Sequence, residues 1–153
     1  MLLADKCHGE LVGIAYRCDT DLGCTFVVWD GNVTPEEWRA HRERLLADPA
    51  FSAGSKMFAD LSRAGGAERI STDAVTEMAS VFRADGLGPY KVAVIPNGAW
   101  DKARHFEREV EGSGITVIVF NDVLTAGAWL GIEVGTAATI LGQLRAEMAD
   151  TAR

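Results

Sequence analysis

From residue 56 onward, short apolar runs alternate with longer segments of helical periodicity. The apolar runs cover residues 56–61, 91–95 and 115–120, and each has the length of a strand that is buried on both faces. The segments between them, residues 72–84 and 100–110, repeat apolar side chains at three- and four-residue spacing, as an amphipathic helix does. Because neighbouring parallel strands need crossover helices, this alternation predicts an α/β fold with a mostly parallel sheet.

The N-terminal part predicts a hairpin followed by a helix. Residues 10–18 and 24–33 alternate along two strands, and the Asp/Gly-rich turn at 19–23 joins them, so the first strand is expected to run antiparallel. Thr34-Pro35-Glu36-Glu37 then places a Thr at N-cap, a Pro at N1 and a Glu at N3 of a helix. This helix is expected to run to about Ala47, before an Asp-Pro pair stops it.

Two further helices are expected at the C-terminal end. A short helix runs through Trp129-Leu130-Gly131, and an Ala-rich helix covers about 135–150. We therefore expect one domain over residues 1–153, with five strands and a core over about 10–131. The apolar side of the last helix has to be covered by this domain or by a second copy, and we expect a homodimer.

Composition excludes several classes of protein. Apolar residues make up 48% and charged residues 24% of the chain, which is ordinary globular usage. The net charge of −7 would repel a phosphate backbone, so nucleic acid is not an expected partner. We expect no signal peptide and no membrane span, and therefore a cytoplasmic protein.

Three cysteines are an odd number and contain no CxxC pair, which argues against a disulfide framework. Cys18 and Cys24 flank the hairpin turn, so they are either a redox pair across the hairpin or free thiols in a reducing cell.

Metal ligands are too few for a predicted site. Cys7-His8 supplies two, a site needs three or four, and His41 and His105 lie at no ligand-type spacing from them. We expect no metal and no cofactor.

Several segments resemble the STAS family, named for sulfate transporters and anti-sigma factor antagonists. The matching pieces are Trp29 to Thr34 before the first helix, Phe58-Ala59-Asp60-Leu61-Ser62 as central strand, and Ser71-Thr72 at the next helix start. The ends Phe120-Asn121-Asp122 and Trp129-Leu130-Gly131 are similar to those of uncharacterised small bacterial relatives. The resemblance covers most of residues 10–131 and implies a STAS-like fold.

The resemblance also implies a regulatory role for Ser71 and Thr72. In signalling members of the family, a partner kinase phosphorylates a serine at this helix start and thereby blocks docking, which added charge on a contact surface explains. Here Arg69-Ile70 and Asp73-Ala74 depart from the family motif. The alternative is that Ser71 or Thr72 is an ordinary N-cap.

Asp60, Ser62 and Asn97 follow the apolar runs of two predicted strands. The carboxyl ends of parallel strands are where α/β sheets bind ligands, so these residues are candidates for a ligand or partner surface. Hydrogen bonds that cap the loop explain Asp60 and Ser62 equally well.

The sequence thus favours a non-enzymatic regulatory or protein-interaction module. The alternative is a module that binds a small apolar or lipid-like ligand, since STAS-like folds resemble lipid-exchange domains and the chain is rich in large aromatics: Trp29, Trp38, Tyr90, Trp100 and Trp129.

A third interpretation is an enzyme of unknown reaction, with Asp60, Ser62, His41 or His105 as candidate groups. No nucleophile and base are brought together by a motif, and His41 is expected at the edge of the core instead.

Overall fold

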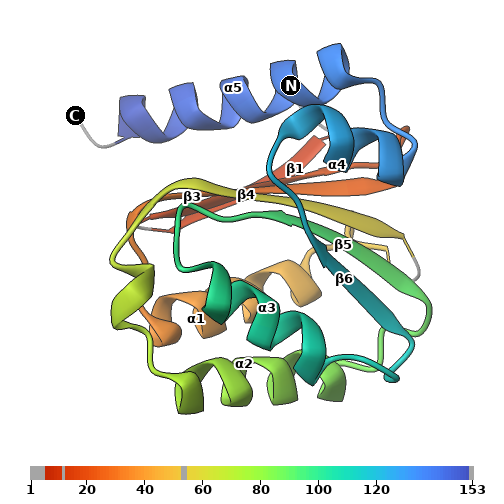
Figure 1. Cartoon of the computed structure of the whole chain (residues 1–153). Helices are drawn as coiled ribbons and strands as arrows, with labels where there is room; N and C mark the ends of the chain where they lie inside the picture. The colour runs from red at the N-terminus through yellow and green to blue at the C-terminus, as the bar shows by residue number, and fades with distance from the viewer. Residues whose placement is uncertain (1–5, 12, 53–54, 152–153) are drawn as a thin grey trace.

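Within the residues that the structure describes, the fold is one six-stranded sheet in which every strand lies beside the next one in the sequence. The computed structural model describes residues 6–11, 13–52 and 55–151 (Figure 1). The strands are β1 Lys6–Leu11, β2 Ile14–Asp19, β3 Cys24–Asn32, β4 Lys56–Gly65, β5 Tyr90–Ile95 and β6 Ile115–Val119. The pairs β1–β2 and β2–β3 are antiparallel, and the pairs from β3 to β6 are parallel.

Five α-helices in the described part of the chain cover the two faces of the sheet. They are α1 Pro35–Ala47, α2 Thr72–Ala84, α3 Trp100–Glu109, α4 Val123–Leu130 and α5 Val134–Thr151, and a short 3₁₀ helix, η1 Ala67–Arg69, precedes α2. The expected α/β class, the mostly parallel sheet with an antiparallel first strand, and the extra C-terminal helix are all confirmed.

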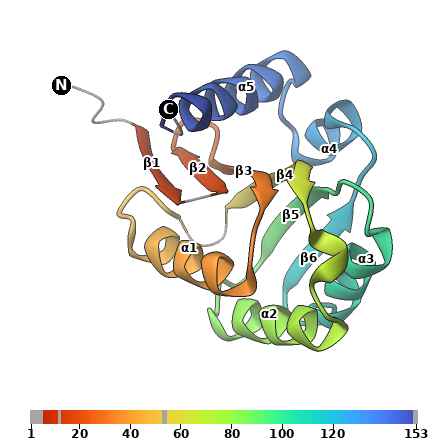
Figure 2. The same cartoon turned by 90° about the vertical axis from the view of Figure 1, so that its left-hand side faces the viewer.

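The sequential strand order places α1, α2 and α3 on the same face of the sheet (Figures 1 and 2). Crossovers between neighbouring parallel strands are right-handed, so three of them running in one direction along the sheet fall on one side. The opposite face is covered by α4, which packs on β4 and β5, and by α5, which packs on β2 and β3.

Two separate cores result, one on each face. Along β4, Met57 and Ala59 belong to the core under α1, α2 and α3, whereas Phe58 belongs to the core under α4 and α5. This alternation follows from the two-residue period of a strand. The runs in β4 and β5 are therefore largely buried on both faces, as the sequence predicts, whereas in β6 Thr116 is exposed and Ile118 is half-buried.

The start of α1 confirms the predicted capping box. The Thr34 hydroxyl accepts a hydrogen bond from the Glu37 backbone N–H at 3.1 Å, and the Glu37 carboxylate accepts one from the Thr34 N–H at 3.1 Å. Two N–H groups that lack helical partners are satisfied in this way.

The five expected strands correspond to β2–β6, and β1 adds a sixth at the edge. The prediction of one strand over 10–18 is wrong at its beginning, because the chain reverses at Gly13. Gly13 has φ of +83°, and a Cβ there would lie 3.1 Å from the Asn32 carbonyl oxygen and from Val33 Cγ2. Glycine is favoured at this backbone conformation, so Glu10 and Leu11 pair in β1 instead.

Helix α5 is covered by its own sheet. Its apolar side chains Ala137, Ile140, Leu141 and Leu144 are buried in the core with Phe26 and Phe58. The need for a second copy to cover this stripe therefore disappears, and the homodimer remains a prediction.

Within the described part of the chain, no single helix has the length and hydropathy of a membrane span. Helices α4 and α5 have the required length and hydropathy only when they are taken together, and the chain bends by 114° at the break between the two helices.

Cys18 and Cys24 are both buried, and no disulfide joins them to each other. They point into the two different cores, so the sheet lies between their side chains and the redox pair across the hairpin is excluded. Burial raises the pKa of the Cys24 thiol to about 12, which keeps it protonated.

Candidate functional site

The strand-end residues that the sequence predicts as one surface are divided between the two faces of the sheet. Asp60 is 2% exposed and lies on the face that α5 covers, where it forms an ion pair with Arg145. Its second carboxylate oxygen accepts a hydrogen bond from the Ser62 N–H at 2.9 Å, and Arg145 also lies 3.4 Å from the Ser62 hydroxyl. Asn97 lies on the other face, where it borders a pocket.

An irregularity in the strand pairing accompanies this arrangement. Val28 of β3 pairs with Asp60, and the next recorded pair joins Asp30 to Arg63, so β4 contains one residue more than β3 there. A bulge of this kind changes which side chains face each layer. Leu61 and Ala64 are three positions apart, so they would face opposite sides of a regular strand. Both nevertheless line the pocket.

The contacts of Asp60 hold α5 on the sheet. A second polar contact does the same nearby, because buried Arg17 of β2 donates to Gln143 at 2.6 Å and to Glu147 at 2.9 Å, both on α5. Burial lowers the pKa of the Arg145 guanidinium from its usual value, and the Asp30 carboxylate opposes this shift. Asp60 and Ser62 thus have a role in structure, which the loop-capping interpretation partly anticipates.

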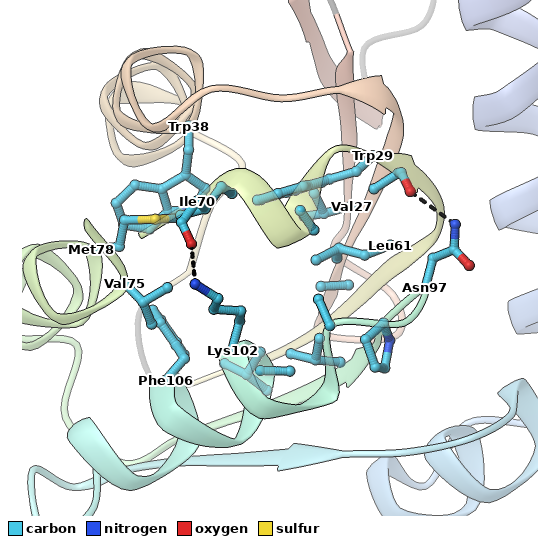
Figure 3. A pocket seen from close by; sticks show the side chains of 18 of the residues that line it. Val27, Trp29, Trp38, Leu61, Ile70, Val75, Met78, Asn97, Lys102 and Phe106 are labelled. Atoms are coloured by element: carbon cyan, nitrogen blue, oxygen red, sulfur yellow. Dashed lines mark hydrogen bonds between the residues drawn. The ribbon is translucent and has the colours of Figure 1, made fainter. Parts of the chain in front are cut away.

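The apolar pocket, as we call it, lies between the opposite face of the sheet and helices α1, α2 and α3 (Figure 3). It has a volume of about 130 Å³. Its floor comes from the strands and its walls from the helices. The principal apolar lining residues are Val27, Trp29, Trp38, Met57, Ala59, Leu61, Val75, Met78, Phe82, Val92, Val94 and Phe106.

Two hydrogen bonds connect the segments at the rim of the apolar pocket. Asn97, in the turn after β5, donates to the carbonyl oxygen of Ala64 at 2.9 Å, and Lys102 of α3 donates to that of Ile70 at 2.5 Å (Figure 3). They tie the β5–α3 region to the end of β4 and to the segment between β4 and α2, respectively. The rim therefore lies at the carboxyl ends of the parallel strands, where α/β sheets bind ligands.

Two buried basic residues of α1 also line the apolar pocket. His41 is 4% exposed, and its ring packs edge-on against Tyr16 with the centroids 5.5 Å apart. Burial, assisted by the charges of Arg42 and Arg44, lowers the pKa of His41 to about 3, so the imidazole is neutral near pH 7. Arg42 is 2% exposed and pairs with Asp85 at the end of α2.

The sequence does contain a signal for Arg42. Trp38, His41, Arg42 and Leu45 repeat at three- and four-residue spacing, and all four are buried. His41 is expected at the edge of the core, and the same spacing puts Arg42 in the buried stripe, where sequence reasoning does not expect a charged residue. Only two of the five large aromatics, Trp29 and Trp38, line the apolar pocket.

Ser71 and Thr72 are both exposed at the start of α2. The Ser71 hydroxyl accepts a hydrogen bond from the Ala74 N–H at 3.0 Å, so Ser71 is the N-cap of this helix. Ser71 follows Ile70, whose side chain and carbonyl group belong to the rim of the apolar pocket.

The remaining polar candidates form no cluster with the apolar pocket. His105 of α3 is hydrogen bonded to Thr76 of α2 at 2.8 Å, and neither residue lines it. Among the residues whose side chains are described, no three His, Cys, Asp or Glu come together as a metal site, and the side chains of Cys7 and His8 lie outside that part.

Comparison of the chain with models of known protein families, with curated proteins and with solved structures finds no match. The resemblance to the STAS family therefore stays a prediction, and functional inference depends on the geometry described above.

We expect the Asp60–Arg145 pair to be strongly coupled and asymmetric. Arg145→Met leaves a carboxylate buried without its cation and should lower the free energy of unfolding by about 3 kcal/mol. Asp60→Asn should cost less, because the Arg145 side chain is 19% exposed and can turn towards water. Urea unfolding of both single variants and the double variant measures the coupling.

The matched control is the exposed Arg39–Glu77 pair, which also joins two elements. Arg39→Met and Glu77→Gln should show a coupling of no more than about 1 kcal/mol. Equal coupling in the two pairs would contradict a special role for Asp60 in holding α5.

We expect His41 to make stability depend on pH. The imidazole is neutral in the fold and titrates near 6.5 in the unfolded chain, so the unfolded state takes up protons first as the pH falls. The free energy of unfolding should decrease by about 2 kcal/mol between pH 7 and pH 5 for this reason. The decrease continues down to about pH 3.

His41→Phe should remove that part of the pH dependence, as urea unfolding at pH 7 and pH 5 measures. Leu45→Val, a buried variant of the same helix without a titrating group, should keep it. The explanation would be refuted if the free energy of unfolding of His41→Phe fell as much between pH 7 and pH 5 as that of the wild type.

Proposed function

We propose that this protein binds a small apolar molecule in the apolar pocket. The observation that carries the proposal is a cavity of about 130 Å³ with a mainly apolar lining, at the carboxyl ends of the parallel strands. Core packing normally leaves few voids larger than a water molecule. A volume of this size is therefore a reason to expect an occupant.

The volume sets the size of the ligand. An engineered apolar core cavity of about 150 Å³ stays dry and binds benzene, whereas pockets for drug-sized ligands occupy about 300–1,000 Å³. The cavity of about 130 Å³ here suits one six-membered ring or a short branched chain. A long lipid chain would have to extend past the rim into solvent.

A pocket-filling variant tests the proposal. Ala103 of α3 is half-buried and lines the apolar pocket, so Ala103→Leu should occupy part of the volume that a ligand needs. We expect it to weaken binding of cumene, isopropylbenzene, by roughly tenfold, as loss of about two buried methylene groups implies. NMR titration of the backbone amides measures the affinity and locates the site.

The control is Ala40→Leu, at an exposed position of α1 that does not line the apolar pocket. It should bind cumene like the wild type. No saturable binding to the wild type, or equal binding to the Ala103→Leu protein, would reject the proposal.

We also propose a regulatory role as a second candidate, and the exposure of Ser71 and Thr72 at the start of α2 favours it. Phosphate at a helix N-terminus changes local charge and can alter docking. Aspartate is as good an N-cap as serine, so Ser71→Asp keeps the helix while it adds charge.

A pull-down from the native cell should lose a stoichiometric protein partner with Ser71→Asp or Thr72→Asp. Ser71→Asn, which caps the helix without charge, is the control and should keep the partner. Unchanged partners in both charged variants would remove the regulatory proposal.

A further inference from the structure

Arg42 is a buried side chain whose donors are only partly used. Its Nη2 pairs with the Asp85 carboxylate, and the guanidinium carbon lies 4.3 Å from the centre of the Phe82 ring. Nε and Nη1 are buried, and no hydrogen-bond partner is found for either within the described part of the chain. Buried N–H groups without acceptors are costly and rare in folded proteins.

Arg42 also lines the apolar pocket, so a side chain with two unpartnered donors borders the cavity. A buried water molecule needs two to four polar partners. Two other polar side chains of the lining, Asn97 and Lys102, lie at the rim, where each donates a hydrogen bond to a backbone carbonyl. An acceptor atom on an otherwise apolar ligand satisfies the arginine without needing further partners.

The charge around Arg42 decides which acceptor fits. Asp85 is close to Arg42 and its side chain is only 13% exposed, so the two form a largely buried pair without net charge. His41, beside Arg42 in the lining, is neutral. A ligand carboxylate at Arg42 would place a second negative charge close to Asp85, which is unfavourable, and Lys102, the other cation of the lining, donates to the Ile70 carbonyl at the rim.

We propose that the ligand is a ring-sized apolar molecule with one neutral acceptor oxygen, such as a ketone or ester carbonyl, that receives a hydrogen bond from Arg42. This inference rests on the proposed function and names the chemical class that the apolar pocket selects. The apolar lining holds the hydrocarbon part, and the Nε–H and Nη1–H groups orient the oxygen.

Three probes of matched shape test the inference, namely cumene, acetophenone and benzoate, which have the same number of non-hydrogen atoms. Cumene tests the apolar pocket alone. Acetophenone adds a neutral acceptor, and benzoate adds a charged one. Dissociation constants come from NMR titration, and the wild type should bind acetophenone more tightly than benzoate.

Arg42→Met should weaken acetophenone relative to cumene by roughly tenfold, the value of one hydrogen bond to a charged donor. Comparing the ratio of two ligands cancels their different hydrophobicity. Because Arg42→Met leaves Asp85 buried without its partner, the same ratio is measured in the double variant Arg42→Met/Asp85→Asn. Arg39→Met, on the same helix but outside the lining, is the control and should keep the wild-type ratio.

The single variant Asp85→Asn should increase the affinity for one probe, benzoate, where the Arg42 variants decrease the affinity for another. It keeps the donors of Arg42 and removes the charge that neutralises them, so benzoate should improve relative to acetophenone by roughly tenfold. This arm does not depend on a variant that lacks the arginine.

The outcomes separate the two proposals. If cumene binds but the ratio of the acetophenone and cumene dissociation constants is the same in the variants without Arg42, the inference fails. The proposal that the apolar pocket binds a ligand is then kept. Benzoate as the tightest wild-type ligand, or no change of benzoate in Asp85→Asn, also overturns it. If none of the three probes binds, the proposed function fails as well.

Discussion

The sequential strand order determines what each face of the sheet can carry. Because β3 to β6 follow one another across the sheet, their three right-handed crossovers place α1, α2 and α3 together on one face. These connections leave the opposite face open, and only the chain after β6 is left to cover it. Helices α4 and α5 do so, and the Asp60–Arg145 pair joins the last helix to the central strand.

The two faces of the sheet therefore carry different features at the same strand ends. The Asp60–Arg145 pair lies on one face and the apolar pocket on the other. Parity along β4 directs Asp60 to the α5 face and Ala59 to the apolar pocket. The polar groups at the carboxyl end of β4 are therefore used in holding α5. The opposite face keeps an apolar lining, and its rim polar groups donate to backbone carbonyls, so recognition there depends on shape and on Arg42.

The sequence predicts the elements of this fold because local patterns determine them. The bounds of α2, Thr72–Ala84, agree with the prediction, and so does the capping box at Thr34, since periodicity and caps act within one turn. Asp60 shares the face of Phe58 through the two-residue period of the strand, whereas the position of Asn97, in the turn after β5, depends on tertiary packing. The reversal at Gly13 depends on a close backbone approach that no periodic pattern contains.

Arg42 is the residue at which local and global rules disagree, and this disagreement is physically informative. A helix that packs for stability alone would place an apolar residue at that position of its buried stripe. An apolar pocket of about 130 Å³ between sheet and helices forgoes packing contacts that a filled core would make, and this costs stability. Buried donors without acceptors add to that cost. Natural proteins sit just above the stability they need and accept such costs mainly at functional sites. A cavity and an under-used arginine in one place therefore favour a bound molecule over imperfect packing, because one ligand with an acceptor oxygen offsets both costs.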